Sequence, residues 1–344
     1  MAGLRKFFGW LHPNSLTYYL CMKKPAALQP GDTIRLIAPS SPPKDRASLG
    51  KAIAAVKTLG FRIKYSDTIF AHDGYLAGSD EERAKDFQAA FNDSKAKAVL
   101  CVRGGFGATR ILSLVDWDEI REPKIFLGFS DITALSCALW EKCEFPSFSG
   151  PVLTSDLVNE KLEAKSWNHT ISLLTGEKTT GVLVEEPFNP VQPISLVPGE
   201  SFGRLMGGNL SMICSLLGTP WFPNFGKSIL FLEDIGESPY RVDRHLTQLL
   251  DAGVLQTVSG IALGDFRYSD AQRKNDRRRG LQTMESVFLD RLGGLGVPVL
   301  MNLPFGHIKP KITLPFGVVT ILDSERHNLI LQESGVEPVE DEDD

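Results

Sequence analysis

Short apolar runs alternate with longer segments of helical periodicity from Gly31 onward. An isolated apolar run of this length is typical of a buried strand, and apolar residues three and four positions apart indicate a helix with one buried face. In the first half, strands are predicted at Thr33–Ala38, Phe61–Tyr65, Ala98–Val102 and Lys124–Leu127, and helices at Asp45–Leu59, Ser79–Phe91 and Ala108–Val115. This order predicts an α/β fold whose parallel sheet is covered on both faces and binds ligands beyond the carboxyl ends of its strands.

The pattern changes around residues 176–200, where four prolines and no helical periodicity predict a linker with one edge strand. A second α/β region follows. Its predicted helices are Leu210–Leu217 and Tyr240–Leu250, and its predicted strands are Ser228–Leu232, Val258–Leu263, Val299–Met301 and Lys311–Leu322. We therefore predict an N-terminal extension (1–28), an N-terminal domain (29–177), a linker (178–200), a C-terminal domain (201–332) and an acidic, disordered tail (333–344).

Composition and net charge limit the classes of molecule that the chain is expected to bind. The chain has 344 residues, of which 42% are hydrophobic, so it can bury the cores of two domains. A net charge of −5 gives no support for a nucleic-acid partner, and the basic run at residues 273–279 is typical of a solvated surface. No stretch has the length of a membrane helix, and the first residues do not resemble a signal peptide, so no membrane partner is expected.

The five cysteines indicate a reducing compartment. Their number is odd and they lack C-x-x-C spacing, while most of them lie among apolar residues. Buried free thiols and a cytoplasmic location are therefore expected. Met22 is a second plausible start, which would leave residues 1–21 as an extension of unknown purpose.

The segment Lys124–Leu135 contains the strongest candidate for a reactive side chain. Its sequence, K-I-F-L-G-F-S-D-I-T-A-L, predicts a buried strand, a sharp turn at Gly128 and Phe129, and a helix from Asp131. Ser130 would lie at the tip of this strand–turn–helix corner. A hydroxyl held on such a turn can act as a nucleophile, although Ser130 could instead simply cap the helix.

A second glycine-bearing loop, Arg103-Gly104-Gly105-Phe106-Gly107, follows the third predicted strand. It lacks both the G-K-[S/T] of a P-loop and the spacing of G-x-G-x-x-G, so a phosphate site is poorly supported. It could be a tight turn that needs positive φ angles. It could also supply one N–H group of an oxyanion hole, the other being the N–H of Asp131.

A serine nucleophile needs a base and an acid that orients it. His307 lies in a loop held by two prolines after an apolar strand, which makes it the best-placed base; an unpartnered loop histidine is the alternative. The other five histidines are weaker candidates: His169 and His327 lie in polar segments that predict surface positions, His12 lies in the extension, His72 lies in the loop A-H-D-G-Y-L-A-G, and His245 lies on a predicted helix as a surface or core-edge residue.

Glu233, after the apolar run Ser228–Leu232, is the best orienting acid. Asp234 fits less well because successive side chains of a strand point in opposite directions. A helix cap is an alternative role for Glu233. A metal ligand is disfavoured, since no cluster of ligands with metal-site spacing accompanies it.

Together these segments resemble the LD-carboxypeptidase family of serine peptidases. The resemblance extends from about Lys23 to Gln332, and the motifs occur in the family's order. They are R-G-G-F-G (103–107), G-F-S-D-I-T (128–133), G-G-N-L-S (207–211), F-L-E-D-I-G-E-x-P-Y-R-x-D-R (231–244) and P-F-G-H (304–307). Phe106 and Phe129 stand where the family commonly has tyrosine, and the N-terminal extension also departs from the family.

The resemblance implies a catalytic triad of Ser130, Glu233 and His307 and an oxyanion hole, which we assign to the N–H groups of Gly105 and Asp131. It implies an N-terminal Rossmann-like or flavodoxin-like domain, a C-terminal swivelling-type β/α domain, a homodimer, and no metal or cofactor. The family's usual substrate is the cytoplasmic murein tetrapeptide, from which terminal D-alanine is released during peptidoglycan recycling. A branch similar to the microcin C immunity protein cleaves aminoacyl-nucleotide toxins instead.

Two other functions remain open from the sequence. The predicted sheet and glycine loops could form a non-catalytic module that binds a nucleotide or sugar. A glutamine-amidotransferase-like enzyme with a cysteine nucleophile is disfavoured, because the turn carries Ser130 and Cys101 lies within a predicted strand. The arginine that would bind a substrate carboxylate, Arg103 or Arg241, could equally form a structural ion pair.

Overall fold

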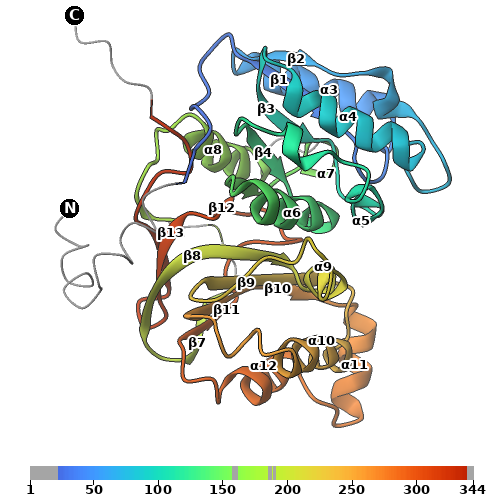
Figure 1. Cartoon of the computed structure of the whole chain (residues 1–344). Coiled ribbons are helices and arrows are strands. Elements are labelled where there is room, and N and C mark those ends of the chain that lie inside the picture. The colour runs from blue at the N-terminus through green and yellow to red at the C-terminus, as the bar shows by residue number, and fades with distance from the viewer. Residues whose placement is uncertain (1–21, 157–161, 185–187, 189–190, 339–344) are drawn as a thin grey trace, which may run out of the picture.

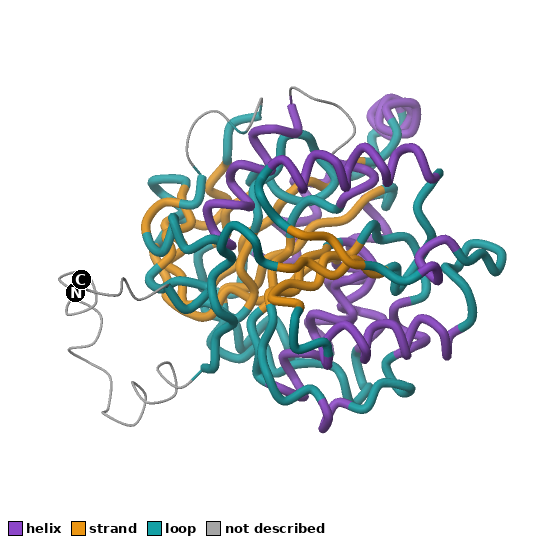
Figure 2. Tube along the Cα trace, turned by 90° about the horizontal axis from the view of Figure 1, so that it is seen from above, coloured by secondary structure: helices purple, strands orange, loops and turns teal. Residues whose placement is uncertain are grey.

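The computed structural model describes residues 22–156, 162–184, 188 and 191–338. Residues 1–21 and 339–344, which form most of the predicted extension and half of the predicted tail, lie outside the described residues. Two sheets dominate the structure, one above the other in Figure 1. Seen from above in Figure 2, strands run through the middle of the molecule and helices lie at its periphery.

The first sheet has six strands in the order β12-β5-β4-β3-β1-β2. Five are parallel, and β12 pairs antiparallel with β5 at one edge. These strands are β1 (Thr33–Ile37), β2 (Arg62–Lys64), β3 (Ala96–Cys101), β4 (Ile125–Gly128), β5 (Ser147–Ser149) and β12 (Leu314–Phe316). The central strand β4 is buried along its whole length, as a parallel strand covered on both faces must be.

The second sheet has eight strands in the order β6-β14-β13-β8-β9-β10-β11-β7. Its four central strands, β8 to β11, are parallel, and antiparallel strands flank them on both sides. These strands are β6 (Gly181–Val182), β7 (Ile194–Val197), β8 (Glu200–Asn209), β9 (Ile229–Ile235), β10 (Gly260–Arg267), β11 (Val299–Met301), β13 (Val319–Asp323) and β14 (Asn328–Leu331).

Helices cover both sheets. Among those of the first half, Ser79 begins α4 with a capping box, as its spacing from Glu82 predicts. The longer helices are α3 (Arg46–Thr58), α4 (Asp80–Asn92), α6 (Thr133–Cys143), α8 (Leu162–Leu174), α9 (Leu210–Leu216), α10 (Pro239–Asp251), α11 (Asp270–Arg278) and α12 (Met284–Leu292). The short ones are η1 (Asp67–Phe70), α5 (Ala108–Ile111), η2 (Trp117–Glu119), η3 (Ser130–Ile132) and α7 (Leu153–Asp156). In Figure 1, α6 lies between the two sheets and α10, α11 and α12 lie below the second.

This architecture confirms the predicted fold class, a mixed α/β fold with a parallel-strand sheet and a second sheet. The domain bounds stay a prediction. The predicted linker 178–200 contains β6 and β7, both of which join the second sheet. The predicted strand Lys311–Leu322 is divided between the two sheets: β12 pairs with β5 in the first, and β13 pairs with β8 in the second.

Two connections hold the sheets together next to the end of β4. The chain leaves the second sheet after β11, passes through His307 and returns to the first sheet as β12. The start of α6 contacts the end of β8, where the Asn209 N–H donates to Thr133 Oγ1 at 3.0 Å. An added Cβ on Gly208 would lie 2.4 Å from Thr133 Cγ2, so only glycine allows this approach. Segments distant in sequence therefore meet at the carboxyl end of β4.

Candidate active site

Ser130 lies at the corner that its sequence predicts. β4 ends at Gly128, and Ser130 begins η3 with a left-handed φ of 66°, which is strained for a residue with a side chain. Ser130 does not cap the helix, because Phe129 and Ile132 occupy the N-cap positions of η3 and α6. The helix-cap alternative is therefore wrong. The Ser130 hydroxyl instead lies 3.1 Å from Nε2 of His307.

His307 also contacts Glu233. Its Nδ1 lies 2.6 Å from Glu233 Oε2, and the side chain of Glu233 is almost fully buried. An ionised carboxylate only accepts hydrogen bonds, so Nδ1 must carry the proton that it donates. In the neutral ring Nε2 is then an acceptor, to which the Ser130 hydroxyl donates. The structure thus brings together the three residues predicted from the loop, the turn and the strand end.

Gly306 makes room for the carboxylate. It has a φ of 98°, and an added Cβ would lie 2.8 Å from both Cβ and Oε2 of Glu233. A side chain at position 306 would thus displace Glu233 from His307.

Replacing Gly306 by alanine should therefore lower the free energy of unfolding for two reasons, the positive φ and the clash with Glu233. The clash should add about 1–3 kcal/mol to the loss that the positive φ causes by itself. The matched control is Gly253→Ala, because Gly253 has a φ of 75° and no atom within 4 Å of an added Cβ. Urea unfolding of both variants measures the difference. Equal losses would show that Glu233 moves aside without cost.

Asn209 and Asp234 support the carboxylate from β8 and β9. Asn209 Nδ2 lies 3.2 Å from Glu233 Oε1 and 3.0 Å from Asp234 Oδ1. Asp234 also accepts bonds from the N–H and hydroxyl of Ser211, at 3.0 and 2.7 Å, and so holds the start of α9. Sequence reasoning missed the contact of Asn209 with Glu233. The available signal was an asparagine directly after two glycines and before a helix, but it indicates only the N-cap that Asn209 also provides.

The glycine loop 103–107 lies against the serine turn. An added Cβ on Gly104 would lie 3.4 Å from Ser130 Oγ, and one on Gly105 would lie 2.2 Å from Ser41 Oγ. The Ser41 hydroxyl in turn accepts from the Phe106 N–H at 3.3 Å. Among the described residues, none accepts a hydrogen bond from the Gly105 N–H. The loop thus presents bare backbone beside the Ser130 hydroxyl.

Asp131 joins this loop to the serine turn through its side chain, a role that sequence reasoning did not predict. Its buried carboxylate accepts from the Ser40 hydroxyl at 2.6 Å and from the Ala108 N–H at 2.8 Å. Burial raises the pKa of Asp131, while these two hydrogen bonds and the charge of Arg83 oppose the shift. Arg83 donates to the carbonyls of Pro39 and Gly107, and so it contacts the same two segments that hold the Asp131 carboxylate.

The remaining polar candidates have other partners. His169 is buried, so its predicted surface position is wrong: its Nε2 contacts the Leu183 carbonyl at 3.2 Å, and its Nδ1 accepts from the Thr313 N–H at 3.2 Å. Arg103 donates to the Pro42 carbonyl at 3.4 Å. Arg241 pairs with Glu237 at 3.5 Å.

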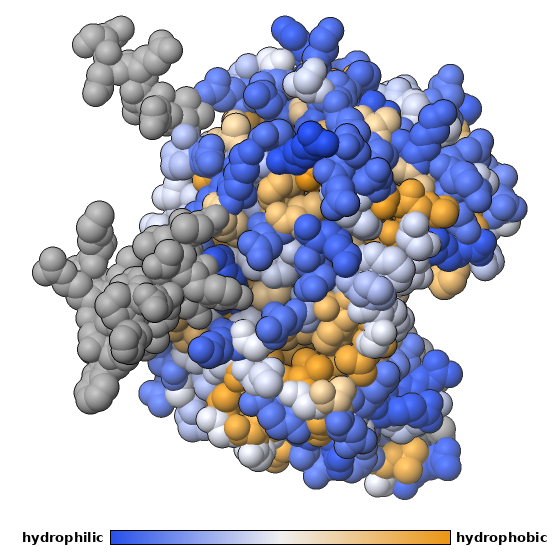
Figure 3. Space-filling view, viewed as in Figure 1, coloured by the Kyte–Doolittle hydropathy of each residue, from blue (hydrophilic) through white to orange (hydrophobic). Residues whose placement is uncertain are grey.

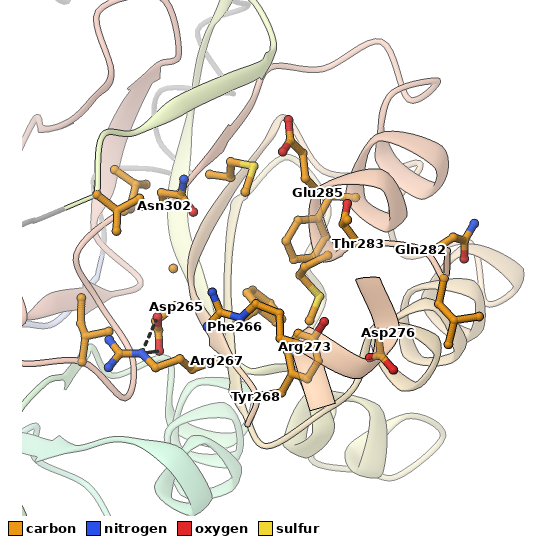
Figure 4. A pocket seen from close by; sticks show the side chains of 18 of the residues that line it. Asp265, Phe266, Arg267, Tyr268, Arg273, Asp276, Gln282, Thr283, Glu285 and Asn302 are labelled. Atoms are coloured by element: carbon orange, nitrogen blue, oxygen red, sulfur yellow. Dashed lines mark hydrogen bonds and ion pairs between the residues drawn. The ribbon is translucent and has the colours of Figure 1, made fainter. Parts of the chain in front are cut away.

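A cavity of about 680 Å³ adjoins the segment after His307. In Figure 4, Asp265 and Arg267 at the end of β10, Arg273 on α11, and Thr283 and Glu285 at the start of α12 surround it. The Arg267 Nε donates to both carboxylate oxygens of Asp265, at 2.9 and 3.0 Å, and burial raises the pKa of Asp265. The cavity therefore combines both signs of charge with apolar walls.

Within the part of the chain that the structure describes, no group of three or more His, Cys, Asp or Glu side chains could hold a metal ion. No described helix has the length and apolar character needed to cross a bilayer.

Comparison with known families matches both halves of the chain. Residues 34–150 match the model of the LD-carboxypeptidase N-terminal domain, and residues 202–322 match that of the C-terminal domain. The chain belongs to the LD-carboxypeptidase family.

The relatives of this chain carry two kinds of name. A probable murein peptide carboxypeptidase of Bacillus subtilis is 37% identical, over 91% of this chain and 95% of the relative. Among solved structures, the muramoyltetrapeptide carboxypeptidase of Oxalobacter formigenes is 32% identical with a TM-score of 0.74, over 87% of this chain and 97% of that one. MccF in complex with glutamyl sulfamoyl guanosine is 25% identical with a TM-score of 0.82, over 91% and 99%.

On the face shown in Figure 3, hydrophobic residues form several separate patches on both lobes, and hydrophilic residues cover most of the remaining surface. Two exposed aromatic side chains belong to the site region: Phe106 of the glycine loop and Tyr75, whose rings meet edge to face at 5.3 Å.

Proposed function

We propose that this chain is a serine LD-carboxypeptidase that releases terminal D-alanine from murein tetrapeptide, with Ser130 as nucleophile, His307 as general base and Glu233 as orienting acid. The observation that carries the proposal is the continuous path of contacts from Ser130 Oγ through His307 to Glu233, at 3.1 and 2.6 Å. Membership of the family supports the reaction class.

The proposed reaction uses these contacts in sequence. His307 Nε2 takes the hydroxyl proton as Ser130 Oγ attacks the carbonyl of the L,D-peptide bond. Glu233 stabilises the imidazolium, and its burial makes that interaction strong because little water screens it. His307 then gives the proton to the departing D-alanine amine, and water releases the acyl group by the same route.

We assign the oxyanion hole to the backbone N–H groups of Gly105 and Asp131. No described residue accepts a hydrogen bond from the Gly105 N–H, and the glycine loop lies close to Ser130; both observations support this assignment. Asp131 lies in the first turn of a helix, where N–H groups lack partners within the helix. Preorganised donors of this kind stabilise the negative oxygen of the tetrahedral intermediate.

A murein peptide as substrate is supported by the names of the relatives from Bacillus subtilis and Oxalobacter formigenes. The cavity lined by Ile308 and Lys309, the two residues after His307, offers space and both signs of charge for a peptide that carries ammonium and carboxylate groups. Arg103 and Arg241 remain candidates for binding the carboxylate of D-alanine, because Arg103 lies in the glycine loop and Arg241 follows Glu233 on the next helix.

A second candidate is hydrolysis of an aminoacyl nucleotide, as in the microcin C immunity branch. The higher TM-score to MccF bound to glutamyl sulfamoyl guanosine favours it. Both candidates use the same three catalytic side chains and differ in what the rest of the site binds.

The deciding experiment incubates the full chain with murein tetrapeptide and, separately, with an aminoacyl sulfamoyl adenosine, and follows products by mass spectrometry. Release of D-alanine by the wild type, but not by Ser130→Ala, supports the first proposal. Cleavage of the adenosine compound alone moves the chain to the immunity branch. If neither compound is cleaved, a non-catalytic binding module becomes the better explanation.

The cysteines provide a separate test against a thiol nucleophile. Among the described cysteines, Cys101 and Cys137 are buried, and burial raises their pKa values. Burial also raises the pKa of Cys143 to about 11 and that of Cys214 to about 12. Thiolates at these positions are therefore scarce at neutral pH.

Treatment of the native enzyme with iodoacetamide at pH 8 should leave Cys101 and Cys137 unmodified and D-alanine release unchanged. A serine-directed phosphonate should label Ser130 and stop the reaction. Peptide mass spectrometry locates both labels. Inactivation by alkylation of Cys101 would instead favour the amidotransferase-like alternative.

We further propose that the enzyme acts in the cytoplasm as a homodimer. The free, buried thiols among the described cysteines suit a reducing compartment, and the homodimer follows from the family resemblance. Cell fractionation and light scattering test the two statements separately.

A further inference from the structure

A buried ion pair lies next to Phe129, the residue before the proposed nucleophile. Lys311, four residues after His307, places its Nζ 3.0 Å from Oδ1 of Asp156 at the end of α7. The side chains are only 3% and 4% exposed. Neither residue has a part in the reaction described above, and the pair lies outside every motif of the family resemblance.

The ammonium group reaches the nucleophile turn through an aromatic ring. Lys311 Nζ lies 3.8 Å from the ring centroid of Phe129, the residue before Ser130. The ring of Phe129 packs against the imidazole of His307, with centroids 4.8 Å apart and planes tilted by 54°. A single aromatic side chain therefore contacts the buried cation and the proposed base.

The ion pair is itself held from both ends. The Lys311 N–H donates to Ser166 Oγ on α8 at 2.9 Å, and Asp156 Oδ2 accepts from the Val152 N–H at 3.0 Å. The ammonium group is thus held in place by residues of α7 and α8. Lys311 itself belongs to the segment that contains His307 and connects the second sheet to the first.

Stability alone does not account for this arrangement. Burial lowers the pKa of Lys311, and the charge and hydrogen bond of Asp156 oppose that shift. A buried pair of this kind seldom stabilises a fold more than well-packed apolar side chains would. A cation desolvated against an aromatic face, by contrast, fixes the position of the ring.

We propose that Lys311 is a positioning residue: held by Asp156, its ammonium group fixes the Phe129 ring, which keeps the strained Ser130 and the imidazole of His307 at hydrogen-bonding distance. The left-handed conformation of Ser130 persists only where its surroundings enforce it. The inference rests on the proposed function, because it assigns Lys311 a role through Ser130 and His307.

The test compares Lys311→Met, Lys311→Arg and the double variant Lys311→Met/Asp156→Asn, which leaves no unpaired buried charge. We expect kcat for D-alanine release to fall about 10- to 100-fold in both methionine variants with KM unchanged, because a small misplacement of reacting groups has effects of this size. Lys311→Arg should recover part of the loss. The control is Lys57→Met, which removes an exposed ammonium group on α3.

A double-mutant cycle tests the route through the ring. Phe129→Leu keeps the ion pair and should lower kcat to a similar extent, and adding Lys311→Met to it should cost little more. Independent, multiplying effects would overturn the proposal, as would methionine variants that keep wild-type kcat or change only KM.

The rate at which a phosphonate labels Ser130 is measured in every variant. A wild type that is labelled but releases no D-alanine contradicts the proposed substrate and leaves the positioning role to be judged from the labelling rates. A wild type that is neither labelled nor active removes the basis of both proposals.

Discussion

Replacing Ser130 by alanine is expected to lower kcat for D-alanine release by about 10⁶-fold, since triad members act as a unit. The change removes the oxygen that forms the acyl-enzyme in the proposed reaction, while the buried contact between His307 and Glu233 stays in place. Mass spectrometry of released D-alanine over long incubations measures the residual rate.

Two further variants make this result specific. Ser215→Ala removes an exposed hydroxyl on α9, whose bond to the Met212 carbonyl is local, and should leave the rate unchanged. Ser130→Ala/His307→Ala should be no slower than Ser130→Ala alone, because the base has no function without the nucleophile. A multiplicative loss in the double variant would mean that the two side chains work independently, contrary to the proposed triad.

Replacing Glu233 by glutamine is expected to lower kcat by about 10⁴-fold while the fold is retained. The amide no longer requires His307 Nδ1 to be the donor, so the tautomer with Nε2 as acceptor for the Ser130 proton loses its support. It also removes the charge that stabilises the imidazolium. KM should change little, because Glu233 is buried beneath the base.

Glu325→Gln is the matched control, since Glu325 lies exposed in the turn between β13 and β14 and should have no effect on kcat. Thermal unfolding of both variants separates catalysis from folding. Near-wild-type kcat in Glu233→Gln would assign the orienting role to another group, of which Asp234 is the nearest by sequence.

The local pattern of apolar and polar residues predicts much of the fold and of the candidate site. The apolar run at residues 124–127, the following glycine and the helical periodicity after it indicate the corner that carries Ser130. Apolar runs that alternate with segments of helical periodicity indicate the α/β class. The spacing of apolar residues depends only on which faces of each strand or helix are buried. The position of His307 after an apolar run and between prolines predicts the base, and the position of Glu233 after a buried strand predicts the orienting acid.

Errors arose where a side chain's partner lies far away in sequence. His169 has polar neighbours in the chain, but it is buried between the Leu183 carbonyl and the Thr313 N–H. Residues 311–322 form one apolar stretch, yet β12 and β13 join different sheets, because hydrophobicity predicts burial and does not identify the neighbouring strand.

Pattern and motifs along the chain are enough to assign the α/β class, the corner that carries Ser130 and membership of the LD-carboxypeptidase family. The folded arrangement alone shows that Ser130, His307 and Glu233 lie within hydrogen-bonding distance, and that Asn209, Asp131 and the Lys311–Asp156 pair surround them. These contacts join residues from both sheets. Their distances depend on how β12 and Thr133 fasten the sheets together, which no local pattern records.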